Sequence, residues 1–256
     1  MSLFKSSTRV ISLLHEGEIA FERKYDFSSI KSFFSSWLRS NYFYHKIPQI
    51  VSDKTYVLTD FQAEILKLKN YRQINFLGGS SEKVIEPLEF GDIKSKGVGN
   101  LKCFFPFSPL RREKGYSLLE TAPDFCSIFY PDNISNNKMW NGYISSDVVI
   151  IPSIELETYS LVLIEAMQMN KFIIASKNLG LVMNLMKKYS LEDLEDLGLY
   201  VISPTSEFVN IAINKVNEVI SGGGESKVIS IYNNEGLDID SATVNLVNKV
   251  IIDAKL

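Results

Sequence analysis

The 256-residue sequence is poor in the residues that build metal sites and disulfide frameworks. It has only two cysteines and two histidines. Cys103 and Cys126 lie in apolar runs at no metal-ligand spacing, so we interpret them as reduced core residues. His15 and His45 are too few and too far apart for a histidine-rich metal site. The sequence therefore predicts no bound metal.

Strong charge of one sign and long apolar runs are also missing. The net charge of -3 shows no basic excess, which gives no support to a nucleic-acid partner. No apolar run approaches the roughly 20 residues of a membrane span, and residues 1–10 lack the apolar core of a signal peptide. We expect a cytoplasmic protein. The aromatic, basic stretch 32–46 leaves peripheral contact with the inner face of a membrane as an alternative to a packed helix.

Two nucleotide-binding motifs are absent. There is no G-x-G-x-x-G after a strand and no G-x-x-x-x-G-K-[ST]. The sequence therefore gives no support to a dinucleotide oxidoreductase or to a P-loop enzyme.

Short apolar runs rich in β-branched residues recur along the chain and alternate with helical patterns. The expected strands are residues 9–15, 55–60, 72–78, 100–105, 125–130, 147–151, 171–176 and 198–203. The expected helices between them include residues 61–68, 117–121 and 206–220. Alternation of this kind predicts parallel sheets covered by helices on both faces.

Three domain-level segments are expected. Residues 1–96 form a partial N-terminal Rossmann-like domain, 97–236 a second Rossmann-like domain, and 237–256 a C-terminal helix. The polar, glycine-bearing stretch 91–100 is the best linker between the two sheets.

The stretch "DVVIIPSIELETYSLVLIEAM", residues 147–167, places carboxylates where a buried strand gives way to a buried helix. Pro152 ends the strand, and helix resumes near Ser160. Glu165 is the only charge inside the helix, and an unpaired buried carboxylate costs several kcal/mol. Glu165 must therefore meet either a protein cation or a ligand donor.

Glu157 lies at the mouth of the strand-to-helix turn. Ligands of open α/β sheets bind outside the carboxyl ends of the strands, beside helix N-termini that attract anions. Carboxylates next to an anion site suit a nucleotide sugar, which has a diphosphate and sugar hydroxyls. The structural alternative is that Glu157 partners the helix dipole and that Glu165 pairs with an Arg or Lys.

The same stretch resembles the donor-binding segment of retaining GT-B glycosyltransferases of family 4, the group 1 glycosyl transferases. Glu157 and Glu165 have that family's spacing of seven intervening residues, and Ala166 and Met167 follow. "SPLRREKGYSLLETA", residues 108–122, resembles the family's first strand-to-helix turn of the donor domain. Together with weaker pieces, the resemblance covers roughly residues 9–220.

The resemblance implies a role for each matching residue. Glu165 would bind the ribose of the donor, and Ser160 and Leu161 would lie beside it in the donor site. Glu157 would contact the transferred sugar, and His15 would approach it from the facing domain. The diphosphate would be held by basic residues of one turn: Lys114, Arg111 and Arg112. The family's reaction uses no metal or cofactor.

Some positions depart from the family pattern. Thr158 and Ser160 stand where the family has glycines around the first glutamate, and Tyr159 lies between them. The N-terminal sheet is short, so we expect self-association or a partner subunit through residues 9–68.

The favoured function is transfer of a sugar from a nucleotide sugar to a saccharide or lipid-linked acceptor, in surface polysaccharide or glycoconjugate synthesis. A non-catalytic glycosyltransferase-like subunit that binds a nucleotide sugar or a partner protein is the main alternative. A GT-B epimerase acting on a nucleotide sugar is a third.

Overall fold

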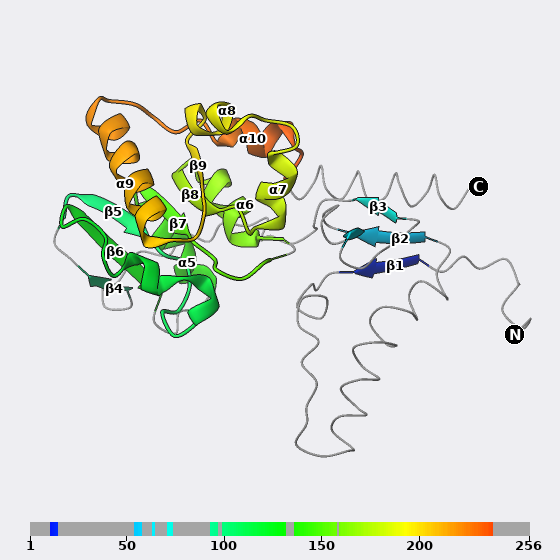
Figure 1. Ribbon diagram of the computed structural model, residues 1–256, viewed down its shortest axis with the longest axis horizontal. Helices are drawn as coiled ribbons and strands as arrows, with labels where there is room; N and C mark the ends of the chain where they lie inside the picture. Colours follow the sequence, from blue (N-terminus) through cyan, green and yellow to red (C-terminus); the bar gives the residue numbers. More distant parts are fainter. Residues whose placement is uncertain are drawn as a thin grey trace, which may run out of the picture. The chain divides into compact units, whose positions relative to one another are not determined.

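The computed structural model describes residues 11–14, 54–57, 63–64, 71–73, 93–96, 99–131, 136–157 and 159–237. The chain divides into two compact units (Figure 1). One comprises Met1–Leu77 with Asp240–Leu256, and the other comprises Gly78–Ile239. The domain boundaries expected from the sequence stay a prediction, and the expected C-terminal helix at 241–252 lies outside the described residues.

The first unit contains a three-stranded parallel sheet. Its order is β1-β2-β3, with β1 at Ile11–Leu14, β2 at Lys54–Val57 and β3 at Tyr71–Gln73. Each strand lies within one residue of a β-branched or aromatic run of the sequence. Val57 of β2 is buried, and so is Ala63, which follows β2 in the chain. The parallel pairing is the one that the sequence predicts.

The second unit contains a six-stranded sheet in the order β4-β6-β5-β7-β8-β9. Its strands are β4 (Ile93–Lys96), β5 (Leu101–Phe104), β6 (Cys126–Pro131), β7 (Val148–Ile151), β8 (Phe172–Ser176) and β9 (Leu199–Ile202). The five strands from β5 to β9 are parallel, and β4 pairs antiparallel with β6 at one edge. The stretch expected to be a linker, 91–100, therefore contributes a strand to this sheet.

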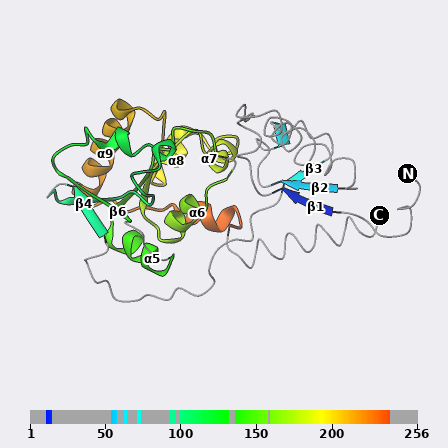
Figure 2. The same cartoon turned by 90° about the horizontal axis from the view of Figure 1, so that it is seen from below.

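Helices of the second unit follow most of its strands. They are the 3-10 helices η3 (Arg112–Lys114) and η4 (Tyr116–Leu119), and the α-helices α5 (Asn136–Ser145), α6 (Leu161–Gln168), α7 (Gly180–Leu185), α8 (Leu191–Asp196), α9 (Ser206–Ser221) and α10 (Ile229–Asn234). Figure 2 shows α5 and α6 on one side of the unit and α9 on the other.

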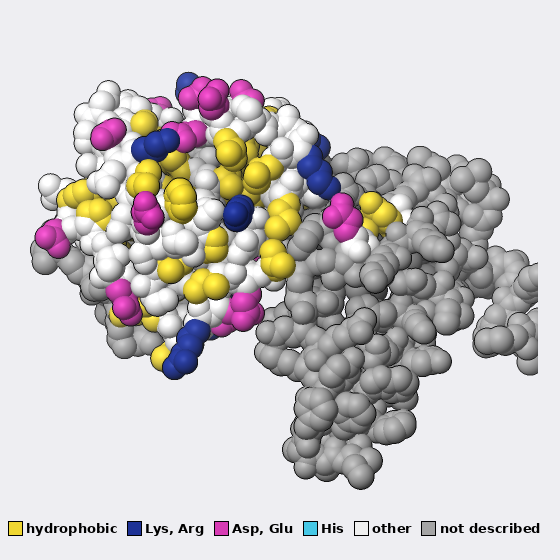
Figure 3. All heavy atoms as spheres, in the orientation of Figure 1, with side chains coloured by type: hydrophobic (Ala, Val, Ile, Leu, Met, Phe, Trp, Pro, Cys, Tyr) yellow, Lys and Arg dark blue, Asp and Glu magenta, His cyan; other side chains and the backbone are white. Residues whose placement is uncertain are grey.

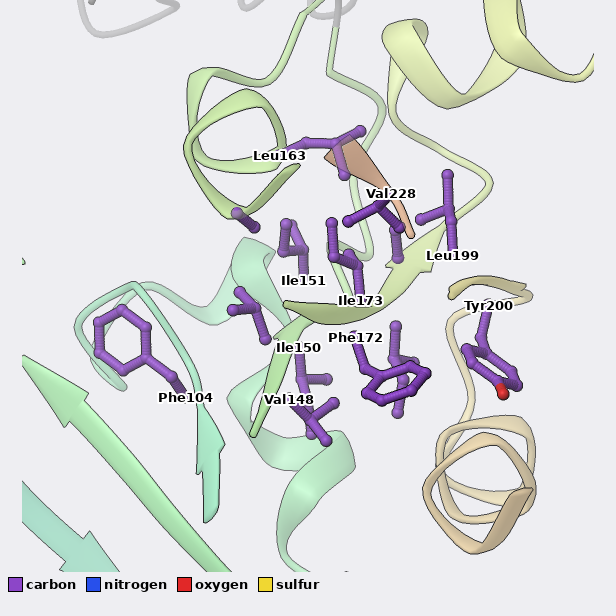
Figure 4. Close-up of a cluster of buried hydrophobic side chains, with 14 of the residues drawn as sticks. Phe104, Val148, Ile150, Ile151, Leu163, Phe172, Ile173, Leu199, Tyr200 and Val228 are labelled. Atoms are coloured by element: carbon purple, nitrogen blue, oxygen red, sulfur yellow. The ribbon is translucent and has the colours of Figure 1, made fainter. Parts of the chain in front are cut away.

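Both faces of the larger sheet are buried at its central strands, β7 and β8. Every residue of β7 and β8 is buried, as their continuous apolar runs predict. In Figure 4, Leu163 of α6 lies on the same side of the sheet as Ile173, whereas Tyr200 points to the opposite side, toward α9. Cys103 and Cys126 are free, buried thiols in this core, which confirms their interpretation as core residues.

Acidic and basic side chains are mixed on the visible face of the larger unit. Figure 3 shows them scattered among apolar side chains rather than gathered by sign. This face presents no extended basic surface of the kind that nucleic acids require.

Candidate functional site

The strand order creates a topological switch point between β5 and β7. The chain leaves β5 for β6 on one side and then returns to β7 on the other side of β5. In open α/β sheets, ligands bind at such a point, beyond the carboxyl ends of the strands. The loops after β5 and β7 carry most of the residues that the sequence singles out.

A buried ion pair joins these two loops. Nζ of Lys114, after β5, lies 2.9 Å from Oε1 of Glu157, after β7. The two side chains are only 10% and 17% exposed. Ser153 donates a second hydrogen bond to the same Oε1, and Lys114 also lies 5.0 Å from the centroid of the Phe107 ring. The structure thus brings together two of the three residues expected to be catalytic.

The pair is held by backbone contacts between the loops. Gly115 has a φ of +80°, and a Cβ there would lie 2.4 Å from the carbonyl oxygen of Pro152. The N–H of Ile154 donates to the carbonyl of Glu113 at 2.9 Å. Only glycine fits both the left-handed conformation and the close approach, so the loop after β5 is fastened to the end of β7.

A third strand end fixes the backbone of Glu157. Its N–H donates to the carbonyl of Asn178 at 2.9 Å, and its carbonyl accepts from the N–H of Gly180 at 2.7 Å. These residues follow β8, so Glu157 forms an isolated parallel bridge with Leu179. Three neighbouring strand ends therefore position one carboxylate.

The helix expected at residues 117–121 is a 3-10 helix, η4. Gly115 separates η3 from η4, and both are 3-10 helices of three or four residues. Neither is long enough to give an N-terminal anion site at Lys114. The neighbouring arginines differ from Lys114 in burial: Nε of Arg111 lies 2.7 Å from Glu113 Oε1, and both Arg111 and Arg112 are exposed.

Ser160 begins α6 at the same edge of the sheet. It is only 4% exposed, yet its Oγ has no hydrogen-bond partner among the residues that the structure describes. It also makes no side-chain cap bond to the helix. The first N–H groups of α6 and an unpartnered buried hydroxyl therefore lie together, as an anion site requires. Leu161, the first helical residue, is 38% exposed.

Glu165 has a partner that the sequence analysis did not foresee. Its Oε2 accepts a hydrogen bond of 2.6 Å from the hydroxyl of Tyr143, on α5. Among the described residues no ion pair involves Glu165, so of the two expected partners, a protein cation or a ligand donor, the ligand donor stays a prediction. Burial raises the pKa of Glu165, and the hydrogen bond from Tyr143 opposes that rise. A buried tyrosine needs a hydroxyl partner, but only the packing of α5 on α6 shows which one.

The remaining expectations lie partly outside the described residues. His15 and Thr158 are not among them. Within the described ranges, no three His, Cys, Asp or Glu side chains gather as metal ligands. No helix described there is long and apolar enough to cross a membrane.

Solved structures resemble this chain at low sequence identity. HepE from Anabaena, in complex with UDP, superposes with a TM-score of 0.61 at 14% identity, over 94% of this chain and 72% of that one. Sucrose-phosphate synthase from Thermosynechococcus elongatus gives 0.56 at 14% identity, over 95% of this chain and 68% of that one.

A glycosyltransferase from Rickettsia africae ESF-5 gives a TM-score of 0.52 at 14% identity, over 80% of this chain and 64% of that one. This chain thus spans less than two thirds of that protein. No family model and no curated protein matches the sequence. The structural neighbours are GT-B glycosyltransferases. The chain has their α/β fold. At these identities the likeness establishes fold, and function has to be argued from the site.

Proposed function

We propose that the protein is a glycosyltransferase that uses a nucleotide sugar as donor and binds it at the carboxyl ends of β5, β7 and β8. The observation that carries this proposal is the buried pair of Lys114 and Glu157 at the switch point. A buried ion pair contributes little net stability, because desolvation of the two charges offsets their attraction. Its position beside the unpartnered Ser160 hydroxyl favours a ligand-binding role.

The chemistry of the site fits the two ends of a nucleotide sugar. Lys114 and the first N–H groups of α6 supply positive charge for the diphosphate. Oε1 of Glu157 already accepts two donors, which leaves Oε2 to accept a hydroxyl of the sugar. Glu165 is half-buried and supplies a second carboxylate for the nucleoside.

The proposed reaction is metal-independent and retains the configuration of the transferred sugar, as in family 4. Lys114 stabilises the diphosphate as it leaves, and Glu157 orients the sugar. Arg111 and Arg112 lie on the same loop and are exposed, so they contact the diphosphate only after a change of side-chain rotamer. His15 lies outside the described residues, and its approach to the sugar stays a proposal from the family resemblance alone. The acceptor is a saccharide or a lipid-linked saccharide of a surface polysaccharide or glycoconjugate.

A non-catalytic nucleotide-sugar-binding subunit is the second candidate. The observation that favours it is the side-chain bulk around Glu157: Ser160 is buried where the family pattern has a glycine, and Tyr159 beside it is half-buried. Such bulk obstructs the close approach of a sugar to the backbone. Self-association or a partner subunit through residues 9–68 remains part of both proposals.

A panel of UDP-, GDP-, ADP- and dTDP-sugars tests the proposal. Thermal shift measures binding, and release of free sugar measures hydrolysis of the donor. Binding with hydrolysis supports the transferase. Binding without hydrolysis, or without transfer to any acceptor, supports the non-catalytic subunit. Failure of every donor to raise the melting temperature would contradict both.

A further inference from the structure

Tyr143 is fully buried, and its hydroxyl forms a hydrogen bond with the half-buried carboxylate of Glu165. Its Oη donates to Oε2 of Glu165 at 2.6 Å, which is short for a hydrogen bond and typical of a charged acceptor. Its ring meets Phe104 edge-on at 5.1 Å between centroids and lies 5.7 Å from Trp140. Because the ring is packed against two other rings, the position of its hydroxyl beside Glu165 is fixed.

The close packing of α5 on β5 fixes the distance of Tyr143 from the sheet. The neighbouring residue is Gly142, and a Cβ there would lie 2.3 Å from the ring of Phe104, on β5. The absence of a side chain lets α5 approach β5 this closely. Tyr143 consequently reaches across to α6 from a position with little freedom to move.

We propose that Tyr143 is a positioning residue that holds Glu165 so that one carboxylate oxygen, Oε1, faces the nucleotide. This inference rests on the proposed function. Oε2 is engaged with Tyr143, whereas Oε1 has no recorded hydrogen-bond partner among the described residues. Oε1 is therefore the oxygen that is free to accept ribose hydroxyls, while the bond to Oε2 fixes the orientation of the side chain.

The same contact controls the ionisation of Glu165. The elements packed against α6 are α5, α10, β7 and β8. Among the described residues on them, Tyr143 is the one titratable group that bears on Glu165. Burial raises the pKa of Glu165 and the Tyr143 hydroxyl lowers it, so Tyr143 keeps the carboxylate ionised over a wider pH range.

A ligand-free experiment tests the contact itself. Glutamate labelled with 13C at the carboxyl carbon is incorporated into the wild-type protein and the Tyr143→Phe variant, and the Glu165 resonance is assigned with Glu165→Gln. The titration midpoint of Glu165 should be higher in Tyr143→Phe than in the wild type. Tyr189→Phe is the matched control, because it removes a hydroxyl that donates to Glu235 at 3.2 Å. An unchanged midpoint in a folded Tyr143→Phe variant would overturn the inference.

A calorimetric titration of the wild type and Tyr143→Phe with UDP, 2′-deoxy-UDP and 3′-deoxy-UDP tests the ligand side. At least one deoxy analogue should bind the wild type about tenfold more weakly than UDP does. That penalty should be smaller in Tyr143→Phe, because Glu165 is then no longer held in position to accept the hydroxyl. The same penalty in both proteins would overturn the positioning role.

The two experiments separate this inference from the proposed function. If UDP, GDP, ADP and dTDP all fail to bind the wild type, the proposed function is wrong and so is the nucleotide part of the inference. A shifted Glu165 midpoint in Tyr143→Phe would then still establish the control of Glu165 by Tyr143.

Discussion

Two ion pairs of the larger unit differ in where they lie. Lys114 and Glu157 are 10% and 17% exposed at the switch point of the sheet. Lys215 of α9 and Glu195 of α8 are 50% and 40% exposed, although their separation of 2.7 Å is shorter. The exposed pair is an ordinary surface contact that contributes about 1 kcal/mol or less. The two pairs differ in burial and position rather than in distance, and on those two grounds we assign a ligand-binding role to the first pair only.

The largest difference is expected from removing each lysine. Lys114→Met keeps the stem but removes the charge, and should lower turnover about 100-fold or more, because charge on the leaving diphosphate grows toward the transition state. Donor affinity should fall less than turnover. Lys215→Met should leave both unchanged. Initial rates and donor binding of the two variants measure this, and equal losses in turnover and affinity would make Lys114 a simple binding residue.

The double variant Lys114→Met/Glu157→Gln sharpens this test. Lys114→Met alone leaves a mostly buried carboxylate without its cation and should destabilise the fold. Removing both charges should restore the melting temperature without restoring turnover. Recovery of turnover in the double variant would contradict the proposed role of Lys114.

The next largest effect concerns two glycines with the same backbone conformation. Gly115 and Gly223 have φ values of +80° and +82°, but a Cβ at Gly223 meets nothing within 4 Å. Gly223→Ala should lower the free energy of unfolding by about 1 kcal/mol through strain alone. Gly115→Ala adds a clash with the backbone of Pro152 and should lower it by several kcal/mol. Urea unfolding of both variants measures the difference. Similar losses in the free energy of unfolding would show that the loop moves to accommodate a Cβ at position 115.

Glu165→Gln should weaken donor binding by about 1.5–3 kcal/mol, the strength of hydrogen bonds to a charged group. The fold should survive, because glutamine keeps the shape and still accepts the Tyr143 hydroxyl. Calorimetric titration measures the change. Unchanged nucleotide affinity in a folded variant would remove Glu165 from the donor site.

The smallest effect is on stability as a function of pH. Because the pKa of Glu165 is raised in the folded state, the folded protein holds this proton more tightly than the unfolded chain does. Its contribution to stability is present at acid pH and is lost as pH rises through the raised pKa. Glu165→Gln should therefore melt at a higher temperature than the wild type at neutral pH, with the gap closing toward about pH 4. A constant gap would contradict the shifted pKa.

The sequence predicts the strands well because their signal is local. All eight expected strands are present, since each is a short apolar run rich in β-branched or aromatic residues. The sequence did not predict β4. Every second residue of its "IKSK" is a lysine, and it pairs antiparallel with β6 at the edge of the sheet. The helix predicted at 117–121 is present only as a short 3-10 helix, which begins directly after Gly115 in its left-handed conformation.

Contacts between elements could be predicted only where topology dictates them. Lys114 and Glu157 meet because parallel neighbouring strands end at one edge of the sheet, which strand assignment alone suggests. The bond from Tyr143 to Glu165 depends on how closely α5 packs, and that follows from Gly142 against Phe104. No periodicity in the sequence encodes such an approach.

The central claim is that a nucleotide-sugar donor binds at the carboxyl ends of β5, β7 and β8, beside α6, and one measurement tests it most directly. The best-binding nucleotide sugar of the panel is titrated calorimetrically into the wild type, Glu165→Gln and Lys215→Met under identical conditions. The account predicts that the wild type and Lys215→Met bind equally and that Glu165→Gln binds at least about tenfold more weakly. Equal binding by all three proteins, or no binding by the wild type, would contradict it.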